Sequence, residues 1–127
     1  MKLIRAAWLI ILDSKKGKVL IIKRSGSVNN PFQWCFPGGS SKKLKSKKLA
    51  KKETKEEVGI KVKGINLILK VPLRIKRYFF YVYYSKKGKT PIVLNYESTR
   101  YKWVKLSKLH NQKNLHKSVK IFLENYE

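Results

Sequence analysis

Acidic residues are scarce in this sequence. Only seven of its 127 residues are Asp or Glu, against 31 Lys and Arg, which gives a formal net charge of +24 at pH 7. A field of this size attracts polyanions such as nucleic acid and nucleotides. Of the basic residues, 26 are lysines spread along the whole chain, so a general compositional bias and a selected affinity for nucleic acid both stay open. A weak, salt-sensitive, non-specific association with nucleic acid is expected under either.

Cysteine and histidine are also nearly absent. The single cysteine, Cys35, excludes an internal disulfide. It stands between Trp34 and Phe36 in an apolar segment, which favours a packed thiol over a nucleophile. One cysteine and two histidines are a poor basis for a zinc site.

Long apolar runs are missing as well. The longest near the N-terminus, residues 6–12, is too short for a transmembrane helix or a signal peptide, so we expect a soluble, cytoplasmic protein with no membrane partner. A length of 127 residues with 43% hydrophobic content predicts one domain over residues 1–127.

Three of the seven acids stand close together at Glu53, Glu56 and Glu57. Spacings of three and four residues place them on one face of a helix, where like charges repel by about 0.2–0.5 kcal/mol per pair. A divalent cation would reverse that penalty, since Mg²⁺ binds one or two carboxylates together with substrate phosphates. A solvated face whose glutamates pair with lysines is the alternative.

The residues around these glutamates carry a family pattern. The run from Lys52 to Ile60, KETKEEVGI, resembles the second half of the Nudix box, G-x5-E-x7-R-E-U-x-E-E-x-G-U, in which U is aliphatic. The matching residues are Glu53, Glu56, Glu57, Gly59 and Ile60, at the spacing set from Gly38. The preceding WCFPGG, residues 34–39, is similar to the strand and turn that lead into the box in many Nudix hydrolases.

Three positions depart from the pattern. Leu44 replaces its first Glu, Lys52 its Arg, and Thr54 its aliphatic residue. If Gly39 rather than Gly38 is the anchor, the loop is one residue short. Lys52 can orient Glu53 only as a point charge and not as a planar fork. The resemblance therefore implies a site altered at its edges, with reduced activity or a shifted substrate as open alternatives.

Hydrophobic periodicity and turn residues predict the elements. We expect strands over residues 2–12, 18–23, 60–69 and 74–84, with turns at residues 13–17 and 85–89. A helix is expected from about Lys47 to Val58, with Ser46 as its N-cap and Gly59 as its C-terminal stop. A turn of helix at residues 106–109 and an amphipathic C-terminal helix should follow. This order indicates an α/β layered domain, and the resemblance implies the Nudix α/β/α sandwich with a mixed β-sheet between helices.

Several segments are candidates for the rim of the site. The polar loop of residues 25–33 runs directly into residues 34–39 and should lie there. The lysines of residues 42–52 either attract phosphate or form a solvated face. Gly38 and Gly39 allow a sharp turn or a close approach to a ligand. The tyrosines of residues 74–84 belong to the core or stack on a base.

Glu97 is a fourth candidate acid. It precedes Trp103 by six residues, a spacing that resembles a segment of many Nudix hydrolases in which an acidic residue adds a metal ligand or a general base. A surface-loop glutamate is the alternative, because a general base has to lie within reach of the attacking water.

The resemblance implies a Mg²⁺-dependent Nudix pyrophosphohydrolase, with Mn²⁺ as a second choice of metal. Glu53, Glu56, Glu57 and Glu97 would hold the metal and perform catalysis with Lys52, and Gly38, Gly39 and Trp34 would bind substrate. The substrate would be a nucleoside diphosphate linked to another group, and the single domain favours a nucleoside triphosphate, oxidised or not. The alternative is a weakly active or inactive Nudix-like module that binds RNA or nucleotides through its basic surface. A monomer and a homodimer are both open.

Overall fold

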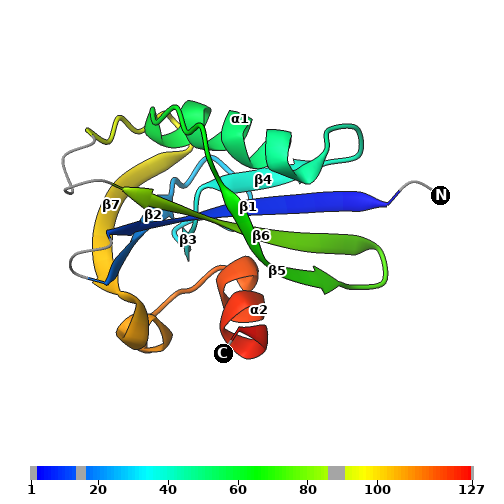
Figure 1. Cartoon of the computed structure of the whole chain (residues 1–127). Coiled ribbons are helices and arrows are strands. Elements are labelled where there is room, and N and C mark those ends of the chain that lie inside the picture. The colour runs from blue at the N-terminus through cyan, green and yellow to red at the C-terminus, as the bar shows by residue number, and fades with distance from the viewer. Residues whose placement is uncertain (1–2, 14–16, 86–90, 127) are drawn as a thin grey trace.

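A seven-stranded mixed sheet organises the chain, shown in Figure 1. The computed structural model describes residues 3–13, 17–85 and 91–126. Strand β1 (Ile4–Asp13) carries the buried run from Ala6 to Ile11 and lies at the centre of the sheet because it has neighbours on both sides. Along one side it pairs in parallel with β6 (Lys76–Ser85). Along the other it pairs antiparallel with β4 (Gly38–Ser41) and then with β2 (Lys18–Arg24).

The outer strands extend this sheet in both directions. Strand β5 (Asn66–Pro72) pairs with β6, while β3 (Trp34–Cys35) and β7 (Ser98–Lys105) pair with β2. All three pairings are antiparallel. Among the strand pairs of the described residues, β1–β6 alone is parallel, which makes the sheet mixed, as expected.

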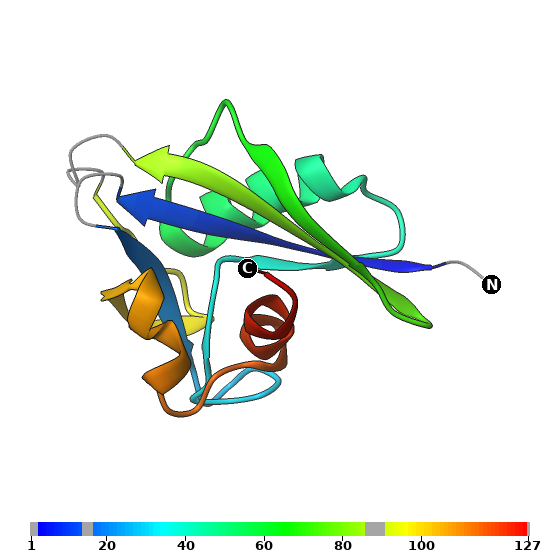
Figure 2. The ribbon, with the colours of Figure 1, turned by 60° about the horizontal axis from the view of Figure 1, so that its bottom comes forward.

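Helices cover both faces of the sheet. Helix α1 (Ser46–Val58) packs on β4 and β1, and α2 (Lys117–Asn125) lies on the opposite side, as Figures 1 and 2 show. A 3₁₀ helix, η1 (Leu106–Asn111), connects β7 to the segment before α2. The fold is therefore the predicted α/β/α sandwich. No helix among the described residues is long and apolar enough to cross a membrane.

Aromatic packing fixes α2 to the sheet. The rings of Phe36, Phe80 and Phe122 have centroids 5.2–6.5 Å apart, and all three side chains are buried. Together they bury several hundred Å² of apolar surface, and aromatic pairs of this kind contribute about 0.5–1.5 kcal/mol beyond their area. The C-terminal helix was expected to carry an apolar stripe of five residues, of which Val119 and Phe122 are buried within α2. Leu115 is buried but precedes the helix, Leu123 is partly buried, and Tyr126 is 41% exposed after the helix ends.

Two predictions about local structure were wrong. Ser46 is the first residue of α1 and not its N-cap; Lys45 holds the cap position without a side-chain bond, and the Ser46 hydroxyl lies 2.6 Å from the Tyr81 hydroxyl. The strand expected over residues 60–69 begins only at Asn66. Ile60, Val62 and Ile65 are buried, so these apolar residues pack in the core without pairing in the sheet.

Other predictions were confirmed. Strands β1 and β2 form the expected hairpin, with Leu12 opposite Val19, although residues 14–16 of its turn lie outside the described residues. Gly59 ends α1 in the left-handed conformation, with φ 73°. The turn predicted at residues 85–89 also lies outside the described residues, apart from Ser85.

Candidate active site

The buried side of helix α1 determines where its glutamates lie. Leu49, Ala50, Thr54 and Val58 form its buried side. Glu57 lies on the same side and is only 3% exposed. The Glu57 carboxyl group therefore lies on the side of α1 that faces the sheet, whereas Glu53 and Glu56 are more exposed.

A glycine pair gives this edge of the helix its close contact with β4. A Cβ on Gly38 would collide with the carbonyl oxygen of Ala7 and lie 2.8 Å from Trp8 Cα. A Cβ on Gly39 would lie 3.0 Å from Cδ of Glu53. The two glycines are therefore needed for close approach, and the backbone of Gly38 hydrogen-bonds the Glu57 carboxyl group.

Glu57 is the most unusual of these groups. Its Oε2 atom is buried and has no hydrogen-bond partner. Burial, followed by repulsion from Glu53 and Glu97, raises the pKa of Glu57 to about 9, against smaller opposing contributions from Gly38 and Arg24. A buried carboxyl group that lies between two other carboxyl groups is unfavourable as a charged group unless a cation joins it.

Lys52, Glu53 and Glu56 form an interacting set beside it. Lys52 Nζ lies 3.3 Å from Glu56 Oε1 and 3.7 Å from Glu53 Oε2. Partial burial, followed by a hydrogen bond with Glu56 and its charge, raises the pKa of Glu53 to about 7. The hydrogen bonds from Glu53 and Lys52 lower the pKa of Glu56. Lys52 therefore contacts both acids, as the point charge that the sequence predicted.

A cavity of about 230 Å³ opens next to these groups. Glu53, Glu97, Gly38 and Gly39 are among its lining residues, so four predicted site residues from α1, β4 and the turn before β7 meet there. Glu97 is held by its backbone: its amide donates to Asn95 Oδ1 at 3.1 Å, and its carbonyl accepts from the Ser25 amide at 2.8 Å.

Most of the rest of the lining escaped the sequence analysis. It consists of Trp8, Arg24, Asn29, Asn30, Ser40, Lys76 and His116. Asn29 and Asn30 belong to the polar loop that was expected at the rim, but β1, β2, β6 and the residue before α2 supply most of the others. Arg24 and Lys76 bring positive charge to the cavity opposite the carboxylates, an arrangement suited to a phosphate chain with a cation.

The comparisons with known proteins agree with this geometry. The model of the NUDIX domain matches residues 2–126. The chain belongs to the NUDIX domain family. It is thus a Nudix hydrolase, of a family that acts on phosphoanhydride bonds in nucleotide substrates and generally uses divalent metal ions. No curated protein matches the sequence.

Solved structures of Nudix proteins resemble this one over most of their length. The MutT protein of Methanosarcina mazei Go1 is 26% identical, with a TM-score of 0.71 over 95% of this chain and 90% of that one. The MutT Nudix hydrolase of Burkholderia pseudomallei is 22% identical, with a TM-score of 0.75 over 97% of both chains. A Deinococcus radiodurans protein, at 14% identity, has a TM-score of 0.78 over 100% of this chain and 86% of that one. The last two likenesses concern the fold.

One predicted substrate-binding residue of the Nudix hydrolase lies elsewhere. Trp34 is 6% exposed and is not among the residues that line the 230 Å³ cavity. Its backbone forms an isolated parallel bridge with Leu115, in the segment before α2, and the Lys102 ammonium group lies 4.6 Å from its ring centroid. In this structure Trp34 supports the sheet near α2.

The other two departures from the Nudix box, at residues 44 and 54, lie in the packed part of the structure. Leu44, where the pattern has Glu, packs partly buried against the core. Thr54 is fully buried, and its hydroxyl has no hydrogen-bond partner. Both changes lie on the packed side of the loop and helix, so neither removes one of the clustered carboxyl groups.

The donor chemistry fits a hard divalent cation. Glu57 has a buried carboxylate oxygen without a hydrogen-bond partner, and Glu53, Glu57 and Glu97 repel one another. A bound divalent cation would accept that oxygen as a ligand and offset the repulsion. Within residues 3–13, 17–85 and 91–126, however, no three His, Cys, Asp or Glu side chains already converge as a ready-made ion site. The carboxyl groups would therefore have to reorient to close on a cation.

Proposed function

We propose that this Nudix hydrolase is magnesium-dependent and cleaves a phosphoanhydride bond of a nucleoside triphosphate, oxidised or not. The observation that supports this most is the buried, unpartnered carboxyl group of Glu57 beside Glu53 and Glu97. Buried polar groups are nearly always hydrogen-bonded, so an unsatisfied carboxylate next to a cavity favours a ligand that completes it.

The four glutamates would hold the metal and activate the water. Glu53, Glu56 and Glu57, with Glu97, would hold the cation, which supplies charge that neutralises phosphate oxygens and promotes ionisation of the attacking water. Glu97 completes this ligand set or takes the proton of the water as it attacks phosphorus. The bridging P–O bond then breaks, and its electron pair leaves with the departing phosphate group.

Other groups bind and orient. Lys52 contacts Glu53 and Glu56 and holds them in position. Arg24 and Lys76, on the lining of the 230 Å³ cavity, attract the phosphate oxygens. The backbone at Gly38 and Gly39 forms the part of the cavity that would hold the phosphates. The absence of side chains there leaves room for the Glu53 carboxylate.

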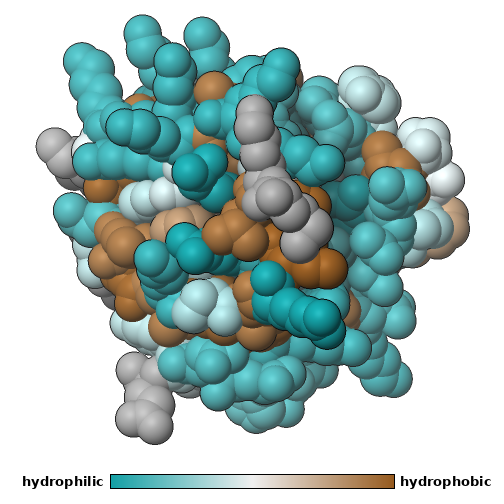
Figure 3. Space-filling view, turned by 90° about the vertical axis from the view of Figure 1, so that its right-hand side faces the viewer, coloured by the Kyte–Doolittle hydropathy of each residue, from teal (hydrophilic) through white to brown (hydrophobic). Residues whose placement is uncertain are grey.

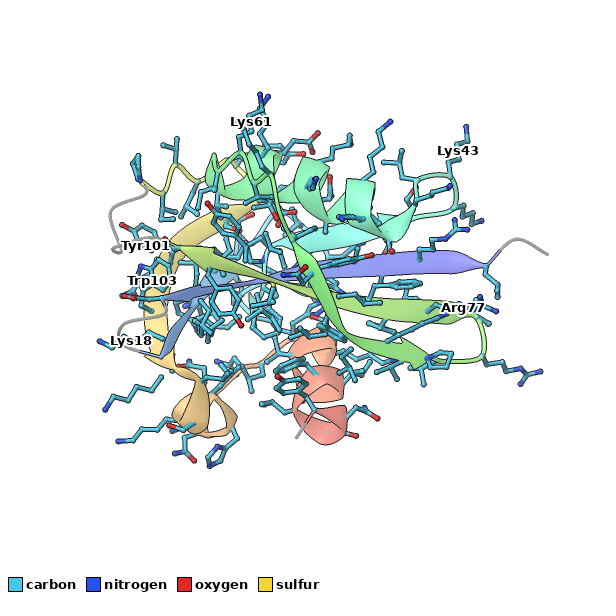
Figure 4. All side chains as sticks on the ribbon, in the orientation of Figure 1. Lys18, Lys43, Lys61, Arg77, Tyr101 and Trp103 are labelled. Carbon is cyan, nitrogen blue, oxygen red and sulfur yellow. The ribbon has the colours of Figure 1, made fainter. Side chains whose placement is uncertain are left out.

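A pure binding module is the competing proposal. Leu44, Lys52, Thr54 and the net charge of +24 favour it. Figure 4 shows Lys18, Lys43, Lys61 and Arg77 projecting from different sides of the molecule, an arrangement that supports weak, non-specific contact with nucleic acid over one dedicated surface. The clustered carboxyl groups argue for catalysis, because a binder of polyanions gains nothing from adjacent acids.

The experiment is a panel of nucleoside triphosphates, dinucleoside polyphosphates and nucleotide sugars, assayed for release of phosphate or pyrophosphate with Mg²⁺ and with Mn²⁺. Glu56→Gln is the test variant, since Glu56 is exposed and its replacement should leave the fold intact. Glu124→Gln, on the exposed surface of α2, is the matched control. Turnover of triphosphates that is lost only in Glu56→Gln supports the proposal. Binding without hydrolysis by the wild type with either metal would establish the binding module.

A further inference from the structure

Strand β7 forms an open edge of the sheet. It pairs with β2 along one side, and no other strand of the described residues pairs with it. Figure 1 shows β7 at the margin of the sheet, on the left of the view. The free side of an edge strand carries backbone N–H and C=O groups with which an extended segment of another chain can pair.

The pairing between β7 and β2 is regular. Their register runs without a shift from the pair Lys18–Lys105 to the pair Lys23–Arg100. Residues 98–105 contain no proline and no glycine. The free side of β7 therefore has the regular spacing of hydrogen-bonding groups that a further strand needs.

The hydrogen bonds to β2 determine which backbone groups face outward. The Leu106 amide donates to the Gly17 carbonyl oxygen at 3.0 Å, in the same register as the rest of the pairing. In an antiparallel ladder every second residue directs both its N–H and its C=O group to the partner strand. Counted back from Leu106, the even-numbered residues of β7 bond β2. The backbone groups of Tyr101, Trp103 and Lys105 therefore face away from β2, and within the described residues no other segment bonds them.

This edge is rich in positive charge. Arg100 and Lys105 are exposed on β7, and Lys23 of β2 lies directly opposite Arg100. Lys102 adds a further cation, with its Nζ 4.6 Å from the Trp34 ring centroid. Residues 98–105 contain no Asp or Glu, and neither Arg100 nor Lys105 forms an ion pair within the described residues. Unpaired cations in a row favour an anionic ligand.

Aromatic side chains lie on one face of the same edge. Because successive side chains of a strand point to opposite faces, Tyr101 and Trp103 share one face, and Arg100 and Lys102 share the other. Tyr101 is 46% exposed and Trp103 is partly exposed, and Figure 4 shows both at the margin of the molecule. An added strand would thus place alternate side chains against aromatic rings and against cations.

The opposite edge of the sheet is different. Strand β5 has a register shift between Leu67 and Leu69 and ends at Pro72, and bulges and prolines are features that protect an edge from pairing. Leu73 and Ile75, in the turn between β5 and β6, are exposed. Figure 3 faces the side of the molecule with this turn and shows a band of apolar side chains bordered by hydrophilic ones. An anionic strand therefore suits β7 better than β5.

We propose that β7 binds an extended acidic segment of a partner protein, which adds a strand to the sheet. Carboxylates of this segment would lie beside Arg100 and Lys102, and the apolar side chains between them would pack on Tyr101 and Trp103. A second copy of this chain would bring the same cations to the same edge, and its net charge of +24 opposes that pairing. Nucleic acid would meet the cations, but its backbone has no N–H group for the outward carbonyl oxygens of β7.

Binding of a designed peptide tests this with the wild-type protein. The probe is an end-blocked, fluorescently labelled peptide that alternates Glu and Val, compared with two versions that carry N-methyl groups on every Glu or on every Val. In a paired strand only one of these two sets directs its N–H groups to β7. Methylation of that set should weaken binding about 10-fold or more, because it removes hydrogen bonds of the ladder. Methylation of the other set should change the affinity less than about threefold.

A proline in β7 provides the second measurement. The Tyr101 N–H faces away from β2, so Tyr101→Pro removes an outward donor and keeps the hydrogen bonds to β2. Tyr101→Ala is the matched control, since both variants lose the ring. Tyr101→Pro should bind the unmethylated peptide about fivefold more weakly than Tyr101→Ala.

The charge of the edge is tested separately. The double variant Arg100→Ala, Lys105→Ala should bind the unmethylated peptide about 10-fold more weakly than the wild type. The matched control is Lys43→Ala, Lys61→Ala, which removes the same charge from exposed positions away from β7, as Figure 4 shows. This control should keep the affinity of the wild type.

Three results would overturn the inference. The first is no binding of the unmethylated peptide, or equal affinities for both methylated peptides, since either would show that no ladder forms. The second is a single-stranded oligonucleotide that binds more tightly than the peptide and loses affinity in Arg100→Ala, Lys105→Ala but not in Lys43→Ala, Lys61→Ala, which would make the edge a nucleic-acid surface. The third is dimerisation of the wild type without peptide that Tyr101→Pro abolishes and Tyr101→Ala does not, which would assign the edge to a second copy.

Discussion

Gly39 leaves the space that the Glu53 carboxyl group occupies: a Cβ at residue 39 would lie 3.0 Å from Glu53 Cδ and closer still to its oxygen. This relationship links the turn into β4 to the position of a candidate metal ligand. A single methyl group added at residue 39 should therefore displace the Glu53 carboxyl group while every carboxylate of the site is retained.

The Gly39→Ala variant should therefore lose activity because Glu53 has to move. We expect kcat/KM to fall about 10-fold or more, since small misplacements of catalytic groups have effects of that size or larger. Gly64→Ala is the control, because a Cβ at Gly64 meets nothing within 4 Å. Steady-state kinetics at saturating Mg²⁺ measures both variants. Equal activity in the two would show that Glu53 tolerates the shift.

The Glu57→Gln variant should be more stable than the wild type in EDTA. The folded-state pKa of Glu57 is raised from 4.5 to about 9. Ionisation of this buried group therefore lowers the free energy of unfolding at any pH above about 4.5, and the loss grows until the pH reaches about 9. At pH 8 the amide should raise the free energy of unfolding by about 1–4 kcal/mol. Urea denaturation at pH 5 and pH 8 measures this; a gain that does not grow with pH would contradict the predicted burial penalty.

Stability should also fall in acid because of His116. Burial, followed by the charges of Arg24, Lys76 and Lys117, lowers the pKa of His116 to about 4. Its neutral Nδ1 accepts a hydrogen bond from the Ser118 amide at 3.0 Å and caps α2. A depressed pKa contributes stability above about pH 6.5, which is lost as the pH falls toward 4.

The loss due to His116 should be about 1–2 kcal/mol, discounted from the full shift because the ring is partly exposed. His116→Asn keeps a cap acceptor and should flatten the decline between pH 6.5 and 4. Thermal denaturation across that range, with Ser107→Asn on the exposed surface of η1 as control, measures it. An unchanged pH profile in His116→Asn would assign the decline to other groups.

Lys52 replaces the arginine of the Nudix box and contacts two of the acids. Lys52→Arg should retain or increase kcat, because a planar fork can bind both carboxylates at once. Lys52→Ala should lower kcat several-fold by releasing Glu53 and Glu56. Lys51→Ala, its neighbour on α1, is the control. A Lys52→Ala enzyme as active as this control would show that the lysine does not position the acids.

Local patterns predicted most of the elements and the acidic residues of the site, because each depends on spacing within one segment. The helix predicted from about Lys47 to Val58 agrees with the observed Ser46–Val58 to within one residue. The cavity could not be predicted in the same way. Arg24, Lys76 and His116 come from β2, β6 and the residue before α2, and only the order of strands in the sheet brings them together.

The errors have physical causes as well. Ser46 has the residue type of an N-cap, but the Tyr81 hydroxyl from β6 occupies its side chain. Ile60, Val62 and Ile65 are buried like the apolar residues of a strand, but no strand includes them within the described residues. Trp34 precedes the glycine turn directly, yet it packs near Leu115, away from the lining of the 230 Å³ cavity.

The most direct test of the carboxylate site is Mg²⁺-dependent hydrolysis of a nucleoside triphosphate by the wild type and by Glu57→Gln under single-turnover conditions. The account predicts hydrolysis that requires the metal and falls about 100-fold or more in Glu57→Gln, although that variant is the more stable protein. Hydrolysis by Glu57→Gln within about twofold of the wild type, which is no more than about 0.4 kcal/mol of transition-state stabilisation, would contradict it.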